Sequence, residues 1–109
     1  MTDDLTIIYT TCVDEAEARH IATTLLDEKL IACGNLLPGM ISLYEWEGQR
    51  SEGREIVLLL KTRADLFEAV RQRVLQLHSY DCPCVMAIPV SDVDSAYGQW
   101  LLNGTKAPA

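Results

Sequence analysis

The chain has 109 residues, of which 49% are apolar and 23% are charged, a composition typical of a globular protein. At this length we expect a single domain over residues 1–109. The formal net charge of −7 and the pI near 4.6 disfavour nucleic acid and anionic membranes as partners, because both need a basic patch. No apolar run could span a bilayer, and the N-terminus lacks the profile of a secretory signal. We therefore expect a cytoplasmic protein with reduced cysteines.

The first part of the chain predicts a strand followed by a long helix. Residues 5–11 are rich in β-branched and aromatic side chains, which is typical of a strand. Asp14 and, three positions later, Glu17 form a capping-box pattern, after which apolar residues recur at helical spacing. We expect a helix from about residue 15 to residue 33, ended by Gly34.

The middle of the chain predicts two strands separated by an exposed loop. Pro38 and Gly39 are expected to close the connection from the helix, and residues 40–46 have the composition of a second strand. Residues 47–54 are polar and contain two glycines, so we expect an exposed hairpin loop there. Residues 55–62 are mostly apolar and predict the third strand.

The last part predicts a helix, a strand and a short helix. Asp65 and Glu68 repeat the capping pattern at the start of a second long helix that ends near Leu77. Residues 85–90 predict the fourth strand, and residues 95–102 predict a final short helix. The resulting order, β-α-β-β-α-β, is that of the split β-α-β, or ferredoxin-like, α+β fold, here with an extra C-terminal helix.

Two of the predicted strands are apolar on both faces. A strand with one face in solvent should alternate apolar and polar residues, but residues 56–60 and 85–88 do not alternate. The two long helices can cover only one face of a four-stranded sheet, so the other apolar face needs a partner. We infer an oligomer that buries the second face of each sheet.

Residues 77–90 concentrate an imidazole, a phenol, a carboxylate and two thiols, carried by His78, Tyr80, Asp81, Cys82 and Cys84. The imidazole is either a ligand for copper or zinc, or a helix-end side chain that binds the last carbonyl groups. If residues 82–90 are extended, the two thiols point to the same face and suit a soft cation such as Cu(I). Otherwise they are small hydrophobic residues on either side of a proline.

The other two cysteines have different expected roles. Cys12 lies just before a predicted helix N-terminus, a position that lowers thiol pKa, so it is a candidate reactive residue. Cys33 falls at a predicted helix end and is expected to pack. The chain contains no C-x-x-C motif, so neither a thioredoxin-type redox site nor a zinc ribbon is indicated.

Several short motifs are spread over nearly the whole chain. They are Thr11-Cys-Val-Asp14, Glu28-Lys-Leu-Ile-Ala-Cys33, Ser42-Leu-Tyr-Glu-Trp-Glu-Gly48, Leu58-Leu-Leu-Lys-Thr62, His78-Ser-Tyr-Asp-Cys-Pro-Cys84, Pro89-Val90 and Tyr97-Gly-Gln-Trp100. Together they resemble the CutA divalent-cation-tolerance family. The resemblance implies a ferredoxin-like fold, a tight homotrimer and a cytoplasmic location. It also implies a role in tolerance to copper and other divalent cations rather than in catalysis.

The chain departs from the family's usual His-Pro-Tyr-Glu-x-Pro-Glu form, with Ser79, Asp81 and Cys84 in place of a proline and two acids. Some members of the family are thought to bind copper through a histidine and an acid of this segment and a strand cysteine, which aligns with Thr10 here. We therefore predict a softer site that takes copper as Cu(I) or Cu(II) and is not needed for folding. Its predicted ligands are His78, Cys82 and Cys84.

The resemblance also suggests a cleft between subunits, lined by Tyr44, Trp46, Lys61, Tyr80 and Trp100. Aromatic side chains with one lysine suit a small anionic ligand, as in the similarly built PII signalling proteins, or they simply pack an interface. A PII-like signalling module is therefore the alternative function. An acylphosphatase-type enzyme or a copper chaperone is disfavoured, because the turn at residues 11–14 has neither a glycine and an arginine nor a C-x-x-C motif.

Overall fold

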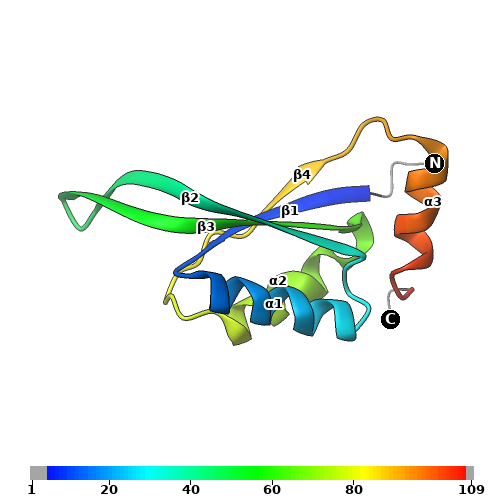
Figure 1. Ribbon diagram of the computed structural model, residues 1–109, viewed down its shortest axis with the longest axis horizontal. Coiled ribbons are helices and arrows are strands. Elements are labelled where there is room, and N and C mark those ends of the chain that lie inside the picture. Colours follow the sequence, from blue (N-terminus) through cyan, green and yellow to red (C-terminus); the bar gives the residue numbers. More distant parts are fainter. Residues whose placement is uncertain (1–4, 108–109) are drawn as a thin grey trace.

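The computed structural model describes residues 5–107, and within this range the elements follow the predicted order (Figure 1). They are β1 (Leu5–Cys12), α1 (Glu15–Asp27), β2 (Cys33–Trp46), β3 (Gln49–Arg63), a 3-10 turn (Ala64–Leu66), α2 (Phe67–Leu77), β4 (Met86–Pro89) and α3 (Ser95–Asn103). The strands form one antiparallel sheet in the order β2-β3-β1-β4. This confirms the ferredoxin-like α+β fold with an additional C-terminal helix. No helix in residues 5–107 is long and apolar enough to cross a membrane.

The core lies between one face of the sheet and the two long helices, which run side by side beneath it in Figure 1. Because side chains alternate along a strand, every second residue of β1 and β3 points toward the helices. The apolar stripes of α1 and α2 meet these residues and exclude water. The fully buried members of this cluster include Ile8, Leu58, Leu60, Ile21, Leu25, Val70 and Val74.

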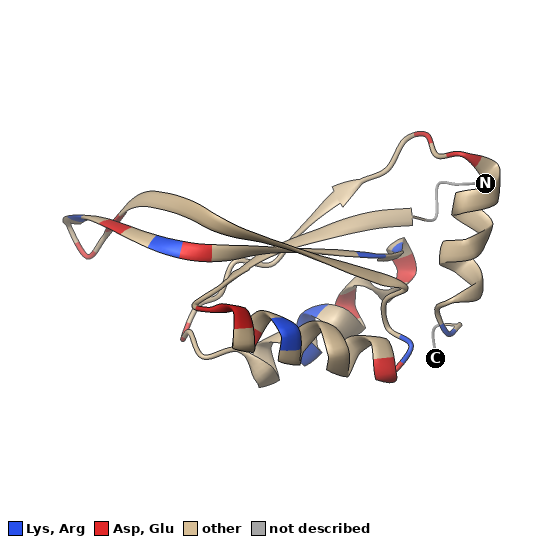
Figure 2. Ribbon diagram, viewed as in Figure 1, with Lys and Arg blue, Asp and Glu red and all other residues tan. Residues whose placement is uncertain are grey.

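The opposite face of the sheet is apolar and, in the described part of the chain, has no helix packed over its centre (Figure 1). Leu37, Met86 and Ile88 are 51%, 54% and 44% exposed. Figure 2 shows that β1, β4 and most of β2 carry no charged residue, as is typical of a surface that is buried against a partner. The predicted strand at residues 85–90 is shorter than expected, and it lies at the sheet edge beside β1.

The β2–β3 hairpin extends well beyond the helices as an arm (Figure 1). The predicted loop at residues 47–54 is wrong, because β3 already begins at Gln49. Glu47 and Gly48, with φ of 53° and 79°, form a two-residue turn of the kind that matches the right-handed twist of the strands. The arm is a two-stranded ribbon that is largely exposed to solvent. Its strands therefore carry many polar residues, a composition that is also typical of loops.

The first helix ends earlier than predicted, at Asp27 instead of near residue 33. Lys29 adopts a left-handed backbone with φ of 61°, and the Leu30 N–H then donates to the Leu25 carbonyl at 2.9 Å. This geometry ends the helix without a glycine. Leu30 and Ile31 are buried as the chain turns back to the sheet, so the apolar spacing continues beyond the helix itself.

Gly34 does not end the helix as predicted but lies in β2, opposite Leu60 of β3. A Cβ atom at this position would lie 3.1 Å from the Cβ of Ala22, so the glycine lets β2 pass close to α1. Pro38 and Gly39 fall at a register shift inside β2, where they bend the strand toward the arm.

The predicted cap of the second helix is also wrong. A 3-10 turn precedes α2, and Leu66 at the cap position makes no side-chain hydrogen bond to the helix. The Asp65 carboxylate instead pairs with the Arg63 guanidinium at 3.0 Å. The arginine is a stronger hydrogen-bond partner for the Asp65 carboxylate than a backbone amide is. The capping pattern in the sequence did not indicate this pairing.

Leu58→Ala is expected to lower the free energy of unfolding by about 2–5 kcal/mol, since it leaves a cavity in a fully buried part of the core. Leu75→Ala, on a side chain that is 44% exposed, is the control and should change it by less than about 1 kcal/mol. Chemical denaturation followed by circular dichroism measures both values. Equal losses in the two variants would contradict this description of the core.

Candidate functional site

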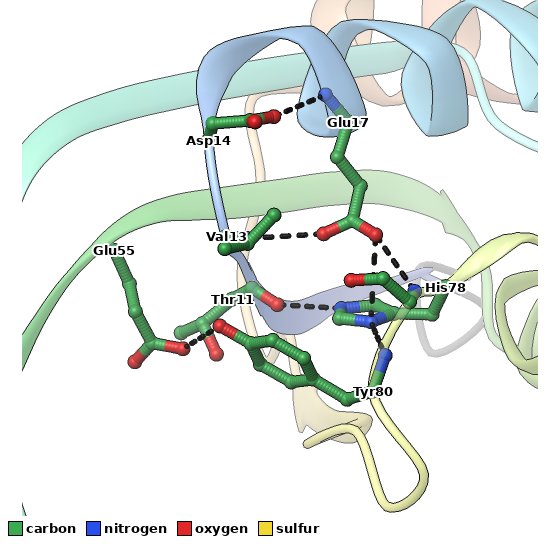
Figure 3. Close-up of polar contacts among 8 residues, drawn as sticks. Thr11, Val13, Asp14, Glu17, Glu55, His78 and Tyr80 are labelled. Atoms are coloured by element: carbon green, nitrogen blue, oxygen red, sulfur yellow. Dashed lines mark hydrogen bonds and ion pairs between the residues drawn. The ribbon is translucent and has the colours of Figure 1, made fainter.

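His78 anchors the loop between α2 and β4 to the end of β1 (Figure 3). Its side chain is fully buried, and its Nε2 lies 2.7 Å from the Thr11 carbonyl oxygen. Its Nδ1 accepts the Tyr80 N–H at 3.1 Å. A carbonyl can only accept and a backbone amide can only donate, so the imidazole is neutral, with its proton on Nε2.

Glu17 joins the same loop to the first turn of α1. Its two carboxylate oxygens accept the Val13 N–H at 3.0 Å and the Ser79 N–H at 2.7 Å. The Asp14 carboxylate accepts the Glu17 N–H at 2.9 Å, so the predicted helix cap is confirmed. Burial alone would raise the pKa of Glu17, but the hydrogen bonds from Val13 and Ser79 hold this pKa below its ordinary value.

Glu55 on β3 holds the phenol end of the loop. The Tyr80 hydroxyl donates to this carboxylate at 2.8 Å, and the Ser42 hydroxyl donates to it at 2.7 Å. Burial would raise the pKa of Glu55, but these hydrogen bonds hold it below its ordinary value. Burial, together with the adjacent Glu55 carboxylate, raises the pKa of Tyr80, so the phenol remains protonated and continues to donate.

Cys12 is buried, and its predicted reactivity is wrong. Burial raises the pKa of its thiol to about 12, with further contributions from the Glu17, Glu55 and Asp14 carboxylates. The thiol precedes a helix N-terminus in sequence, but it points into the core with Ile8 on the same face of β1. Desolvation and neighbouring negative charge therefore outweigh the helix dipole.

One group of three possible metal-ligand atoms converges within the described range 5–107. It consists of Cys12, Glu17 and His78, whose ligand atoms all lie within 4.8 Å of one another. Sequence reasoning assigned Glu17 to helix capping alone and did not connect Cys12 with His78. The signal was present in the topology: β4 pairs with β1, so the loop before β4 must pass the end of β1 and the start of α1.

The thiols of Cys82 and Cys84 do not belong to this group of ligand atoms. Both cysteines are free; Cys82 is exposed and Cys84 is partly buried. They precede β4, which begins at Met86, so the extended strand that was expected to align them is absent at their positions. Burial, and then the Glu55 carboxylate, raises the pKa of Cys84. Joint metal binding by His78, Cys82 and Cys84 stays a prediction.

Three of the aromatic residues predicted to line a cleft lie on β2 and α3, at opposite ends of one chain (Figure 1). Tyr44 and Trp46 are exposed on the arm, whereas Trp100 is exposed on α3, where its ring stacks on that of Tyr97 at 5.6 Å. The Lys61 ammonium donates to the Tyr97 hydroxyl at 3.3 Å and lies over the same ring. The cleft was predicted between subunits, so it stays a prediction.

Thr10 is fully buried, and its hydroxyl oxygen has no hydrogen-bond partner among the described residues. It occupies the position that aligns with the strand cysteine of the resemblance. A threonine hydroxyl is a poor ligand for soft metal ions, so a copper site built on this strand position does not fit the chain.

A family model described as CutA1 divalent ion tolerance protein matches residues 6–104. The chain belongs to this family. The divalent-cation tolerance protein CutA of Pyrococcus horikoshii is 44% identical over 92% of this chain and 97% of its own length. The crystal structure of CutA1 from Oryza sativa superposes with a TM-score of 0.94 at 34% identity, over 99% of this chain and 100% of that one. Membership in the CutA1 family supports a role in divalent cation tolerance.

A further solved relative bears on cellular location. It is a CutA of Archaeoglobus fulgidus described as a periplasmic divalent cation tolerance protein, with a TM-score of 0.91 and 35% identity over 94% of this chain and 99% of that one. The expected cytoplasmic location of this chain is therefore not confirmed.

The structure predicts how acid destabilises the loop. The folded-state pKa of Glu55 lies below its unfolded value near 4.5, so its stabilisation is complete above that pH and is lost as the pH falls through the folded pKa. Glu55→Gln does not titrate, and its denaturation midpoint should therefore fall less between about pH 6 and about pH 3. Glu52→Gln, an exposed site on the same strand, is the control and should keep the parent's pH profile.

Proposed function

We propose that this protein acts in divalent cation tolerance as a homotrimeric, cytoplasmic protein that binds copper and has no catalytic cycle. The observation that carries the proposal is a pair of free thiols, Cys82 and Cys84, on a loop that His78, Tyr80 and Ser79 tie to the rest of the fold. Family membership supports the physiological role, and the donor set supports the choice of metal.

The residues of the loop fit a soft copper ion better than the strand position does. Thiolates select Cu(I), and an imidazole serves both oxidation states. Cys82 is already exposed, so an ion can reach it without unfolding the sheet. His78 joins the two thiols only if its Nδ1 gives up the Tyr80 N–H, so copper binding is expected to rearrange the loop.

The open sheet face supports assembly. Leu37, Met86 and Ile88 are exposed on a sheet whose other side is already filled by helices, and apolar surface of this kind is normally buried against a partner. The family resemblance supports the proposal that the partner is two further copies of the same chain. The arm residues Tyr44 and Trp46 then have neighbouring subunits to contact, which accounts for aromatic residues so far from the core.

The cytoplasmic location stays a prediction from the sequence, because a solved relative is described as periplasmic. A reducing compartment is consistent with four cysteines that are free in the structure. The absence of a catalytic cycle also stays a prediction: it draws its support from the family's description as a tolerance protein.

The assembly is expected to be a trimer that persists on dilution to low micromolar concentration. Size-exclusion chromatography with light scattering measures its mass. Leu59→Asp, which places a charge on the face opposite the buried Leu58, should break the assembly because an unpaired carboxylate would be trapped at an apolar interface. A monomeric parent protein would disprove the proposed assembly.

Cu(I) binding is expected to depend on the loop thiols. The double variant Cys82→Ser/Cys84→Ser should bind Cu(I) at least about tenfold more weakly than the parent, because it loses both thiolate ligands. Cys33→Ser removes a thiol on β2 and serves as the matched control. Competition with a Cu(I) chelator of known affinity measures the difference. Equal affinities of parent and double variant would show that these thiols are not ligands.

A further inference from the structure

Two parts of the chain that are far apart in sequence bring three different ligand atoms together. Cys12 ends β1, Glu17 lies in the first turn of α1, and His78 follows α2. Their ligand atoms lie within 4.8 Å of one another, and the His78 Nδ1 is 3.8 Å from a Glu17 carboxylate oxygen (Figure 3). That separation is too long for a hydrogen bond, so the two groups face each other without bonding directly.

The separation matches two ligands that share one ion. Nitrogen and oxygen atoms at about 2.0–2.2 Å from a tetrahedral zinc ion lie roughly 3.3–3.6 Å apart, and a thiolate at about 2.3 Å lies slightly farther from each. The 3.8 Å between the His78 nitrogen and the Glu17 oxygen therefore needs only a small adjustment. One sulfur, one nitrogen and one oxygen form a donor set that zinc accepts.

We propose that Cys12, Glu17 and His78 form a buried binding site for a divalent cation of the zinc class, with a fourth position open to water. This site extends the proposed metal binding beyond the loop thiols and is distinct from them in ligand set and in preferred ion. It shares only His78 with the proposed copper site, so one chain cannot use both sites at the same time.

The hydrogen bonds around the ligands already orient them. The Nε2–H donated to the Thr11 carbonyl leaves the lone pair of His78 on Nδ1, the nitrogen that faces Glu17. A histidine ligand in a metal site commonly donates its second N–H to a backbone carbonyl in this way. The Val13 and Ser79 amides fix the Glu17 carboxylate. Of these contacts, only the 3.1 Å bond from the Tyr80 N–H to Nδ1 must be given up.

The charge balance selects a dication. On binding, the S–H bond of Cys12 breaks, a sulfur–metal bond forms, and the proton leaves to solvent. The thiolate and the Glu17 carboxylate then carry two negative charges that a divalent ion neutralises, which removes most of the cost of burying charge. A monovalent ion such as Cu(I) would leave a net negative charge in the same buried place. We therefore expect zinc-class ions to bind at the buried site and Cu(I) to bind at the loop thiols.

The test uses the full-length chain, purified without metal, and titrates it with Zn(II) and with Co(II), whose thiolate bond gives an ultraviolet charge-transfer band. The Cys82→Ser/Cys84→Ser background removes the loop thiols. In that background the band should appear and saturate near one ion per chain. Adding Cys12→Ala should abolish it, and adding Glu17→Gln should weaken binding at least about tenfold. Adding Cys33→Ala is the matched control and should leave the band unchanged.

The outcomes separate this inference from the proposed copper function. If the background variant gives no Co(II) thiolate band, or if Cys12→Ala retains it, the buried site is disproved whatever the copper result. Loss of Cu(I) binding in the same background, together with an intact Co(II) band, supports both sites. If Cys12→Ala does not fold, as circular dichroism would show, Glu17→Gln decides: unchanged Zn(II) affinity in that variant overturns the proposal.

Discussion

The hydrogen bond from the buried His78 ring to the Thr11 carbonyl organises the end of the molecule that carries the candidate chemistry. The ring is buried away from solvent, so each of its nitrogens needs a hydrogen-bond partner within the protein. One partner is the last part of β1, and the other is the backbone of the loop at Tyr80. The course of the loop therefore depends on contacts with β1 and with its own backbone around the ring, which makes its shape a property of the whole fold.

The two carboxylates around this ring act together with it. The Glu17 carboxylate accepts hydrogen bonds from two backbone amides, and the Glu55 carboxylate accepts hydrogen bonds from a hydroxyl of β2 and a hydroxyl of the loop. Both have a pKa below the ordinary value in spite of partial burial, so hydrogen bonding outweighs desolvation at both positions. Burial, and then these negative charges, raise the pKa of the Cys12 thiol and keep it protonated, and the charges surround it with a potential that attracts cations.

The sequence was sufficient for the order of elements, the fold class and the open apolar face, because these depend on periodic patterns that extend over many residues. It failed where a single backbone angle or a distant partner decides the structure. Lys29 ends α1 in a left-handed backbone conformation, which a lysine in the sequence does not indicate. The two-residue turn at Glu47 and Gly48 makes a hairpin of a segment whose composition is that of a loop. At the site, local reasoning linked His78 with the thiols nearest in sequence. The fold also places His78 beside Cys12 and Glu17, which only the pairing of β1 with β4 could indicate.

The two proposed metal sites combine the imidazole of His78 with two kinds of thiol. In the proposed copper site, the thiols of Cys82 and Cys84 are free, and Cys82 is exposed to solvent. In the proposed zinc-class site, Cys12 lies on a strand and Glu17 on a helix, and the two negative charges of their side chains suit a dication. Affinity alone ranks copper above zinc at almost any site of nitrogen, oxygen and sulfur ligands. A protein that must distinguish these ions therefore depends on access and charge balance, and the two proposed sites differ in both.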